Sequence, residues 1–182
     1  MPTEDSRQRL FFALWPPLEL GRQMRRVAVK AFSDSNVRHL QADQIHLTLI
    51  YLGPSDPAQR ECAEMAAEQV SAAPFDLALS VLGYWARPRV GWIGPVKTPT
   101  ALDSLVQQLQ QRLPECGYNL DTRPWQAHIT LVRKLRRDPL HRELATPLHW
   151  PVGDFALVES QTLPTGAQYR ILHRWPLQSI AE

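Results

Sequence analysis

Two copies of one short pattern, His-x-Thr-x, carry the side chains best suited to chemistry in this sequence. They are HLTL at 46–49 and HITL at 128–131. If each lies in a strand, its His and Thr share one face, because side chains alternate along a strand. The hydrophobic residues between them then point into a core. Two such strands brought side by side would present two imidazoles and two hydroxyls to one cleft.

This set of side chains is suited to acid–base chemistry at phosphorus. Imidazole titrates near neutral pH, so one of His46 and His128 can accept a proton while the other donates one. The hydroxyls of Thr48 and Thr130 can donate hydrogen bonds to phosphate oxygens as charge develops there. A single strand His is more often structural, but its duplication in corresponding strands favours a catalytic pair. The spacing leaves open which His is the acid.

A metal site is the main chemical alternative at these residues. Two His and two Thr make a poor zinc set, and carboxylates do not cluster near either motif. Cys62 and Cys116 lie in neither a CxxC pattern nor a His-rich segment. We therefore expect Cys62 to be a buried free thiol, without a disulfide or a zinc site. We expect no metal and no cofactor.

The composition is typical of a globular domain. The chain has 182 residues, 44% of them hydrophobic, which is enough for a packed core. A formal net charge of +2 gives no strong field for gripping long nucleic acid, although it does not exclude a local basic cleft. The polar start MPTEDSRQRL lacks a signal-peptide core, and no apolar run approaches the length of a membrane span. We expect a cytoplasmic protein and a monomer.

Hydrophobic periodicity and turn residues predict the elements that position the motifs. Helices are predicted over 18–32, 56–72 and 100–113. The first has an apolar stripe of Met24, Val27, Val29 and Phe32, and the second has Asp56 as its N-terminal cap. Strands are predicted over 10–14, 45–53, 75–85, 89–96 and 127–134, and Gly53-Pro54 ends the second of them. A hairpin is predicted in 154–177 around the turn 164–166. The segment 138–144 is predicted to be a short helix or a loop.

The order of these elements is a weak internal repeat of about 80 residues, too long for a solenoid period. Each half holds a helix, a strand with His-x-Thr, and then a pair of strands. No low-complexity tract or long linker interrupts the chain. Residues 1–182 are therefore treated as one domain with two lobes.

At these residues the sequence resembles the two-histidine (2H) phosphoesterase superfamily, whose hallmark is two H-x-T-x motifs. Within it, the chain looks like the bacterial RNA 2′,3′-cyclic phosphodiesterase family, also named 2′-5′ RNA ligase (LigT/ThpR-like). The likeness covers almost the whole chain. Its matching segments are RLFFAL at 9–14, DQIHLTLIYLG at 43–53, RPRVGWIG at 87–94, RPWQAHITLVRK at 123–134 and YRILHRWPL at 169–177.

The resemblance implies an α+β fold in which two antiparallel sheets, related by pseudo-twofold symmetry, surround a central groove with helices outside. It implies metal-independent opening of a 2′,3′-cyclic phosphate at an RNA end, in a tRNA fragment or short oligonucleotide, to leave a 2′-phosphate. In that family the first-motif histidine is the proton donor, here His46, and the second is the base, here His128. Some members also join or cleave 2′-5′ linkages reversibly.

Further candidate residues flank the motifs. Arg133 could bind phosphate, although strict alternation puts it opposite His128 unless the strand ends or bulges first. Phe11 could stack on a base, but core packing of the first strand is the stronger expectation. Trp85, Trp92 and Trp125 could line the groove or pack as ordinary aromatics. The histidines without an x-Thr partner are expected to be structural or on the surface: His39, His141, His149 and His173.

Other functions use the same residues. The substrate could instead be a small cyclic nucleotide, a 2′-5′ oligonucleotide or an ADP-ribose cyclic phosphate, because the motifs recognise the phosphate and not the rest of the molecule. A non-catalytic module that binds RNA ends is the alternative from another class. Intact His46 and His128 favour catalysis, because binding alone would tolerate Lys or Arg there.

Overall fold

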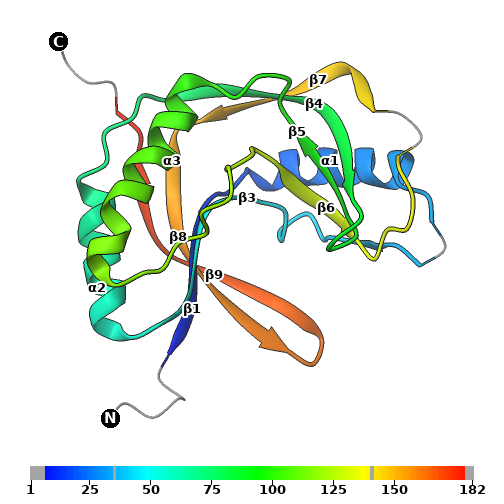
Figure 1. Ribbon diagram of the computed structural model, residues 1–182. Helices are drawn as coiled ribbons and strands as arrows, with labels where there is room; N and C mark the ends of the chain where they lie inside the picture. Colours follow the sequence, from blue (N-terminus) through cyan, green and yellow to red (C-terminus); the bar gives the residue numbers. More distant parts are fainter. Residues whose placement is uncertain (1–6, 35, 140–141, 179–182) are drawn as a thin grey trace.

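Two antiparallel sheets form the body of the computed structural model, which describes residues 7–34, 36–139 and 142–178 (Figure 1). The four-stranded sheet has the order β3 (Leu47–Ser55), β1 (Gln8–Leu14), β8 (Asp154–Leu163) and β9 (Gly166–Pro176). The five-stranded sheet has the order β2 (Arg38–His39), β6 (Ile129–Arg133), β5 (Val90–Gly94), β4 (Phe75–Trp85) and β7 (Glu143–Val152). The predicted α+β class with two antiparallel sheets is confirmed.

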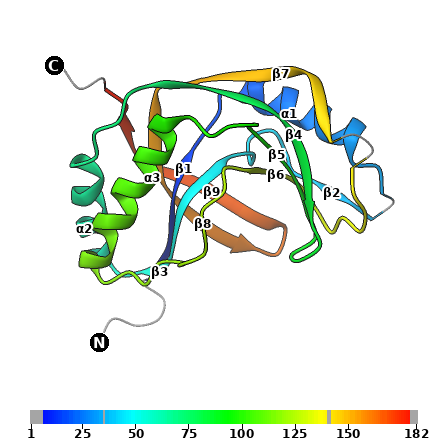
Figure 2. The same cartoon turned by 45° about the horizontal axis from the view of Figure 1, so that its top comes forward.

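Each sheet takes strands from both halves of the chain. β3, which carries the first motif, lies in the sheet that the C-terminal hairpin β8–β9 completes. β6, which carries the second motif, pairs with β5 from the first half. The sequence repeat therefore does not fold into one lobe per half. The two motif strands belong to different sheets and contact one another where the sheets meet (Figure 2).

Three α-helices of the described chain cover the outer sides of the sheets (Figure 1). α1 (Leu18–Ala31) packs on β2 and β6, α3 (Thr100–Arg112) on β3, and α2 (Pro57–Glu68) on β9. All three were predicted, although α2 ends before residue 72. The stripe expected on α1 was partly wrong, since Val29 is 51% exposed. The buried positions Met24, Ala28 and Ala31 instead follow the i, i+4, i+7 spacing of a helix face.

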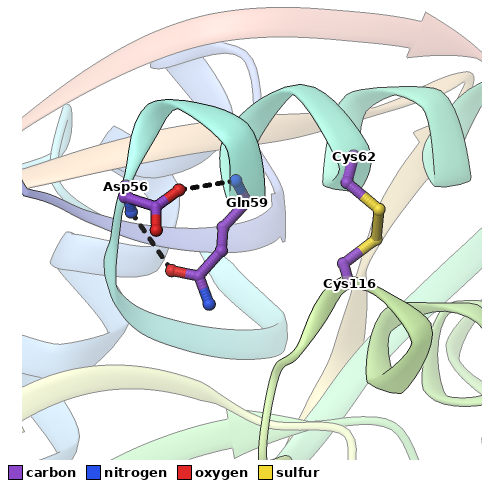
Figure 3. The surroundings of a disulfide bond; sticks show 4 residues. All are labelled: Asp56, Gln59, Cys62 and Cys116. Carbon is purple, nitrogen blue, oxygen red and sulfur yellow. Dashed lines mark hydrogen bonds between the residues drawn. A yellow bond between two sulfur atoms is a disulfide. The ribbon is translucent and has the colours of Figure 1, made fainter.

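Asp56 caps the start of α2, as predicted, and the structure adds a reciprocal contact with Gln59 that completes a capping box (Figure 3). The Asp56 carboxylate accepts a hydrogen bond from the Gln59 backbone N–H at 2.8 Å, and the Gln59 side chain accepts one from the Asp56 N–H at 3.2 Å. This reciprocal pair satisfies two backbone donors that a helix start otherwise leaves free. It fixes the point at which the chain leaves β3.

The expectation of a free thiol was wrong, because Cys62 and Cys116 form a disulfide (Figure 3). The bond joins α2 to the 3-10 helix η2 (Leu113–Cys116) that follows α3. Both cysteines are half-buried. They are 54 residues apart in sequence and meet only because α2 and α3 pack on the same sheet. The local composition around Cys62 contains no signal for that long-range contact.

One hydrophobic core joins both sheets and the helices. It contains Phe12 of β1, Leu77 of β4 and Leu105 of α3, each fully buried. A smaller apolar cluster covers the opposite face of the four-stranded sheet. Its buried members are Phe11, Ala13, Ala156 and Val158, with Trp15, Tyr169 and Ile171 packed against them.

Strand β7 was not predicted. It contains Pro147 and Pro151, which remove backbone donors and lower strand propensity. β7 lies at the edge of the five-stranded sheet, where Pro is tolerated. The C-terminal hairpin is confirmed, and β3 continues past Gly53 to Ser55. The described part of 138–144 is a loop up to β7, whereas 140–141, including His141, lie outside the described residues.

In the described ranges no helix combines the length and the apolar character needed to cross a bilayer.

Candidate active site

The two motifs line one small cavity where the sheets meet. Their intervening residues point away from it, with Leu47 and Ile129 fully buried and Leu49 and Leu131 at 1% and 0% exposure. The predicted alternation is therefore confirmed in both strands. The cavity has a volume of about 60 Å³. Its lining consists of Leu40, His46, Thr48, His128, Thr130 and Arg133.

Arg133 reaches this cavity because β6 contains a bulge. In the pairing of β5 with β6, Gly91 lies opposite Val132 and Trp92 opposite Thr130, so that Leu131 has no partner. The extra residue breaks the alternation, and Leu131 and Val132 are both buried. Arg133 thereby returns to the side of His128. The sequence identified this condition but could not decide whether it was met.

Backbone carbonyls orient both imidazoles in the same way. Nδ1 of His46 lies 2.8 Å from the carbonyl oxygen of Gln44, and Nδ1 of His128 lies 2.8 Å from that of Gln126. Since a carbonyl can only accept, Nδ1 of each ring carries the proton. Nε2 of each ring is left to accept or donate a proton at a bound molecule.

Burial makes both histidines weaker bases than usual. Desolvation is the main cause that lowers the pKa of His46 to about 4, and the positive charges of Arg133 and His128 contribute to this value, whereas the Gln44 hydrogen bond acts in the opposite direction. Desolvation also lowers the pKa of His128. Both rings are therefore mainly neutral near pH 7 in the free protein. A bound anion would raise both pKa values.

Aromatic side chains enclose the ring of His46. Trp15, just after β1, stacks on it with a centroid distance of 4.7 Å and an interplanar angle of 8°. Tyr169 of β9 meets it edge-on at 5.0 Å, and Phe11 lies 5.1 Å away. Sequence reasoning missed Trp15 and Tyr169, because their contact with His46 depends on strand pairing. Phe11 is only 4% exposed, which favours its packing role over base stacking.

The three tryptophans singled out in the sequence also lie near the motifs. Trp85 meets the His128 ring edge-on at 4.5 Å, and Trp92 lies 6.5 Å from it. Trp125 donates its indole N–H to the carbonyl oxygen of Thr48 at 3.4 Å. That bond connects the segment before the second motif to the strand of the first.

The remaining described histidines lie outside the cavity lining. His149 is exposed and contacts the Asp76 carboxylate at 2.6 Å. His173 is exposed beside Trp175, and His39 is half-buried on β2. These positions agree with the structural or surface roles expected for them.

A larger cavity of about 690 Å³ lies between α3 and the segment 118–125. It contains no histidine, and its charged lining residues are Asp103, Asp121 and Arg123. Arg123 is already paired with Asp121, which holds the pKa of that carboxyl at about 2. Of these two cavities, the smaller one is lined by the two motif histidines, whose side chains are suited to acid–base chemistry.

The donors at the motif cavity suit an anion better than a metal cation. Its polar groups are two imidazoles, two hydroxyls and the guanidinium of Arg133. A divalent cation there would lack a carboxylate ligand and would face a fixed positive charge. Within the described ranges, no three His, Cys, Asp or Glu side chains are grouped so that they could hold a metal.

Comparison with known proteins assigns this arrangement to a family. The family model of the 2′-5′ RNA ligase superfamily matches residues 16–163. The chain is 30% identical to the RNA 2′,3′-cyclic phosphodiesterase of Escherichia coli strain K12, over 93% of this chain and 97% of that protein. It is 27% identical to the protein of the same name from Thermus thermophilus, over 93% of this chain and 90% of that protein.

A solved structure agrees with the sequence comparisons over nearly the full length. The crystal structure of E. coli LigT complexed with 3′-AMP superposes with a TM-score of 0.89 at 30% identity, covering 95% of this chain and 99% of that one. The shared fold, the family match and the sequence identity all extend across both motifs. The chain therefore belongs to the 2′-5′ RNA ligase superfamily.

Proposed function

We propose that this protein hydrolyses 2′,3′-cyclic phosphates at RNA ends to leave a 2′-phosphate, using His46 and His128 as its acid–base pair. The observation that carries the proposal is the convergence of two imidazoles, two threonine hydroxyls and Arg133 on one cavity. The relatives named RNA 2′,3′-cyclic phosphodiesterase, and the LigT structure with bound 3′-AMP, support the same substrate class.

The reaction is an in-line displacement at phosphorus. A water oxygen bonds to phosphorus, the bond from phosphorus to the ribose O3′ breaks, and a 2′-phosphate and a 3′-hydroxyl remain. Following the family roles, Nε2 of His128 takes the proton of the water and Nε2 of His46 gives a proton to O3′. Thr48 and Thr130 donate hydrogen bonds to the non-bridging oxygens, and Arg133 balances their charge.

The donor role of His46 depends on the substrate. With a pKa of about 4, the ring of His46 is neutral in the free protein at pH 7. The negative charge of a cyclic phosphate in the cavity raises that pKa and stabilises the protonated ring. Substrate binding and protonation of the acid are thus coupled. The plot of hydrolysis rate against pH should be bell-shaped, because one imidazole ring must be neutral and the other protonated.

The direct test incubates the protein, with chelator present, with an oligoribonucleotide ending in a 2′,3′-cyclic phosphate and with 2′,3′-cyclic AMP. The product is compared by chromatography with 2′- and 3′-phosphate standards. Release of a 2′-phosphate that resists chelator supports the proposal. A 3′-phosphate, or loss of activity with chelator, contradicts it. Turnover of neither substrate favours 2′-5′ linkages, or binding of RNA ends without catalysis.

A further inference from the structure

β2, the β4–β5 turn and the end of β6 lie together at one end of the five-stranded sheet (Figure 2), and each of these segments carries cationic residues. Arg38 of β2 is opposite Arg133 of β6, which is in turn opposite Val90 at the start of β5. The Leu135 N–H donates to the carbonyl of Arg89 at 3.1 Å. The basic rim is defined here as Arg38, Arg87, Arg89, Lys134, Arg136 and Arg137, all of them exposed.

The rim is locally positive although the protein as a whole is nearly neutral. Together with Arg133 it holds seven of the 20 Lys and Arg residues in a chain whose net charge is +2. Over the described ranges, none of the seven makes an ion pair with a carboxylate, whereas Arg60, Arg142 and Arg170 do so elsewhere. Uncompensated cations grouped in this way produce a local field that attracts anions.

The rim is continuous with the motif cavity. Arg133 lines the cavity, and Arg38 lies directly opposite it on the neighbouring strand, so both side chains share one face. Like charges directly opposite one another are unfavourable unless an anion lies between them. The Arg38 guanidinium also lies against the tip of the β8–β9 hairpin, since a Cβ at Gly166 would come within 2.6 Å of its Nη2. Arg38 thus reaches from one sheet to the other beside the cavity.

Two rim residues occupy backbone conformations that normally favour glycine. Arg89 has φ 64° and Lys134 has φ 61°, and no other non-glycine residue of the described chain has positive φ. Such residues are uncommon outside turns and functional sites. A cationic side chain occupies both positions, although Gly would fit the backbone better.

We propose that the basic rim binds the phosphates of the RNA strand that leads away from the terminal cyclic phosphate. The inference rests on the proposed function and extends it from the reacting phosphate to the rest of the substrate. A terminal cyclic phosphate uses both the 2′ and 3′ oxygens, so the strand can continue only through the 5′ oxygen. With the cyclic phosphate between the motifs, the next phosphates meet Arg38 and then the β4–β5 turn. The planar guanidinium of Arg can donate two parallel hydrogen bonds to phosphate oxygens.

The test compares a substrate that reaches the rim with one that does not. Steady-state kinetics are measured with 2′,3′-cyclic AMP and with a short oligoribonucleotide carrying a terminal 2′,3′-cyclic phosphate, over a series of salt concentrations. The main variant is Arg89→Gly/Lys134→Gly, because Gly removes the charges at positive-φ positions without straining the backbone. Its melting temperature should be no lower than that of the wild type. The charge-matched control is Arg22→Gln/Arg26→Gln, on the exposed side of α1.

The expected result is a change for the oligonucleotide alone. Its KM should rise about tenfold in the main variant, and the slope of log KM against log salt should fall by about 1.4, since each of the two lost phosphate contacts contributes about 0.7 for single strands. The constants for 2′,3′-cyclic AMP should stay within a few-fold. Arg38→Gln provides an independent variant that should also raise the oligonucleotide KM. The inference would be overturned if Arg89→Gly/Lys134→Gly and Arg38→Gln both kept the KM and the salt slope of the wild type for the oligonucleotide.

The outcome for the rim can be separated from the outcome for the proposed reaction. If the wild type turns over neither substrate, the proposed function fails. The rim is then tested by fluorescence anisotropy with a labelled oligoribonucleotide ending in a 2′-phosphate. Weaker binding in Arg89→Gly/Lys134→Gly than in the α1 control supports the rim, and equal binding rejects it.

Discussion

Leu49 and Leu131 are each the extra residue of a β-bulge placed directly after the Thr of a His-x-Thr motif. In the first motif strand, Ala13 lies opposite Thr48 and Phe12 opposite Ile50, which leaves Leu49 without a partner. Leu131 is skipped in the same way in the second. The two motif strands therefore share the same bulge at the same position relative to the motif. It places Tyr51, which is opposite Phe11, at the position in its strand that Arg133 has in the other.

Arg133 should contribute strongly to activity because the bulge brings its guanidinium to the cavity. Arg133→Gln should lower kcat/KM for 2′,3′-cyclic AMP about 10- to 100-fold, the range expected on losing a hydrogen bond between charged groups. Arg133→Lys should recover part of this loss, because Lys keeps the positive charge. Recovery should be incomplete, because Lys cannot make the two parallel hydrogen bonds of a guanidinium. Arg112→Gln, at the end of α3, serves as the control. An unchanged kcat/KM in Arg133→Gln would remove Arg133 from the site.

The stacked indole of Trp15 should keep the pKa of His46 low. Desolvation is the main cause of the depressed pKa of about 4, and Trp15 covers one ring face of His46. Trp15→Ala admits water to that face, so the pKa should rise towards the ordinary value of 6.5. An NMR titration of the His46 ring protons measures this directly. Trp85→Ala, which uncovers His128 instead, should leave the His46 pKa nearly unchanged.

Protonation of His46 should destabilise the fold in acid. Its folded-state pKa of about 4 lies below the ordinary 6.5, so between these values the unfolded chain binds a proton that the folded chain does not. Stability should therefore fall as pH decreases through this window, by up to about 3 kcal/mol from His46. Urea unfolding at pH 7 and pH 4 should show a smaller loss in His46→Gln than in the wild type. An equal loss in both proteins would mean that His46 titrates normally.

The disulfide should stabilise the fold without taking part in the chemistry. It closes a loop of 54 residues, for which loop entropy suggests about 4 kcal/mol. Neither Cys62 nor Cys116 lines the motif cavity. Cys62→Ala/Cys116→Ala should therefore lower the free energy of unfolding by about 2–4 kcal/mol while keeping kcat for 2′,3′-cyclic AMP. A loss of kcat in folded protein would show that the disulfide also positions the active site.

The sequence was most informative where the signal was local. Alternation around Thr48 and Thr130 predicted which side chains face the cavity, and Asp56 predicted the start of α2. Both depend on residues within a few positions of one another. The catalytic roles of His46 and His128 remain a prediction that the geometry supports.

The features that sequence reasoning missed depend on contacts between distant segments. Trp15 and Tyr169 surround His46 only because β1, β3, β8 and β9 form one sheet. The exchange of strands between the two halves, and the Cys62–Cys116 bond, likewise have no local signature. β7 was missed because its prolines are acceptable only at a sheet edge. Pairing over long distances in the chain, and not propensity, decides each of these.

The most direct test of the account is the turnover number for 2′,3′-cyclic AMP of His46→Ala and His128→Ala, with His173→Ala as the control for loss of an exposed histidine. The affinity of each protein for 2′-AMP, measured by calorimetry, checks that the cavity still binds phosphate. The account predicts that kcat falls at least about 100-fold in each motif variant while affinity changes only a few-fold. A kcat within a few-fold of the wild type in either variant would contradict the acid–base pair.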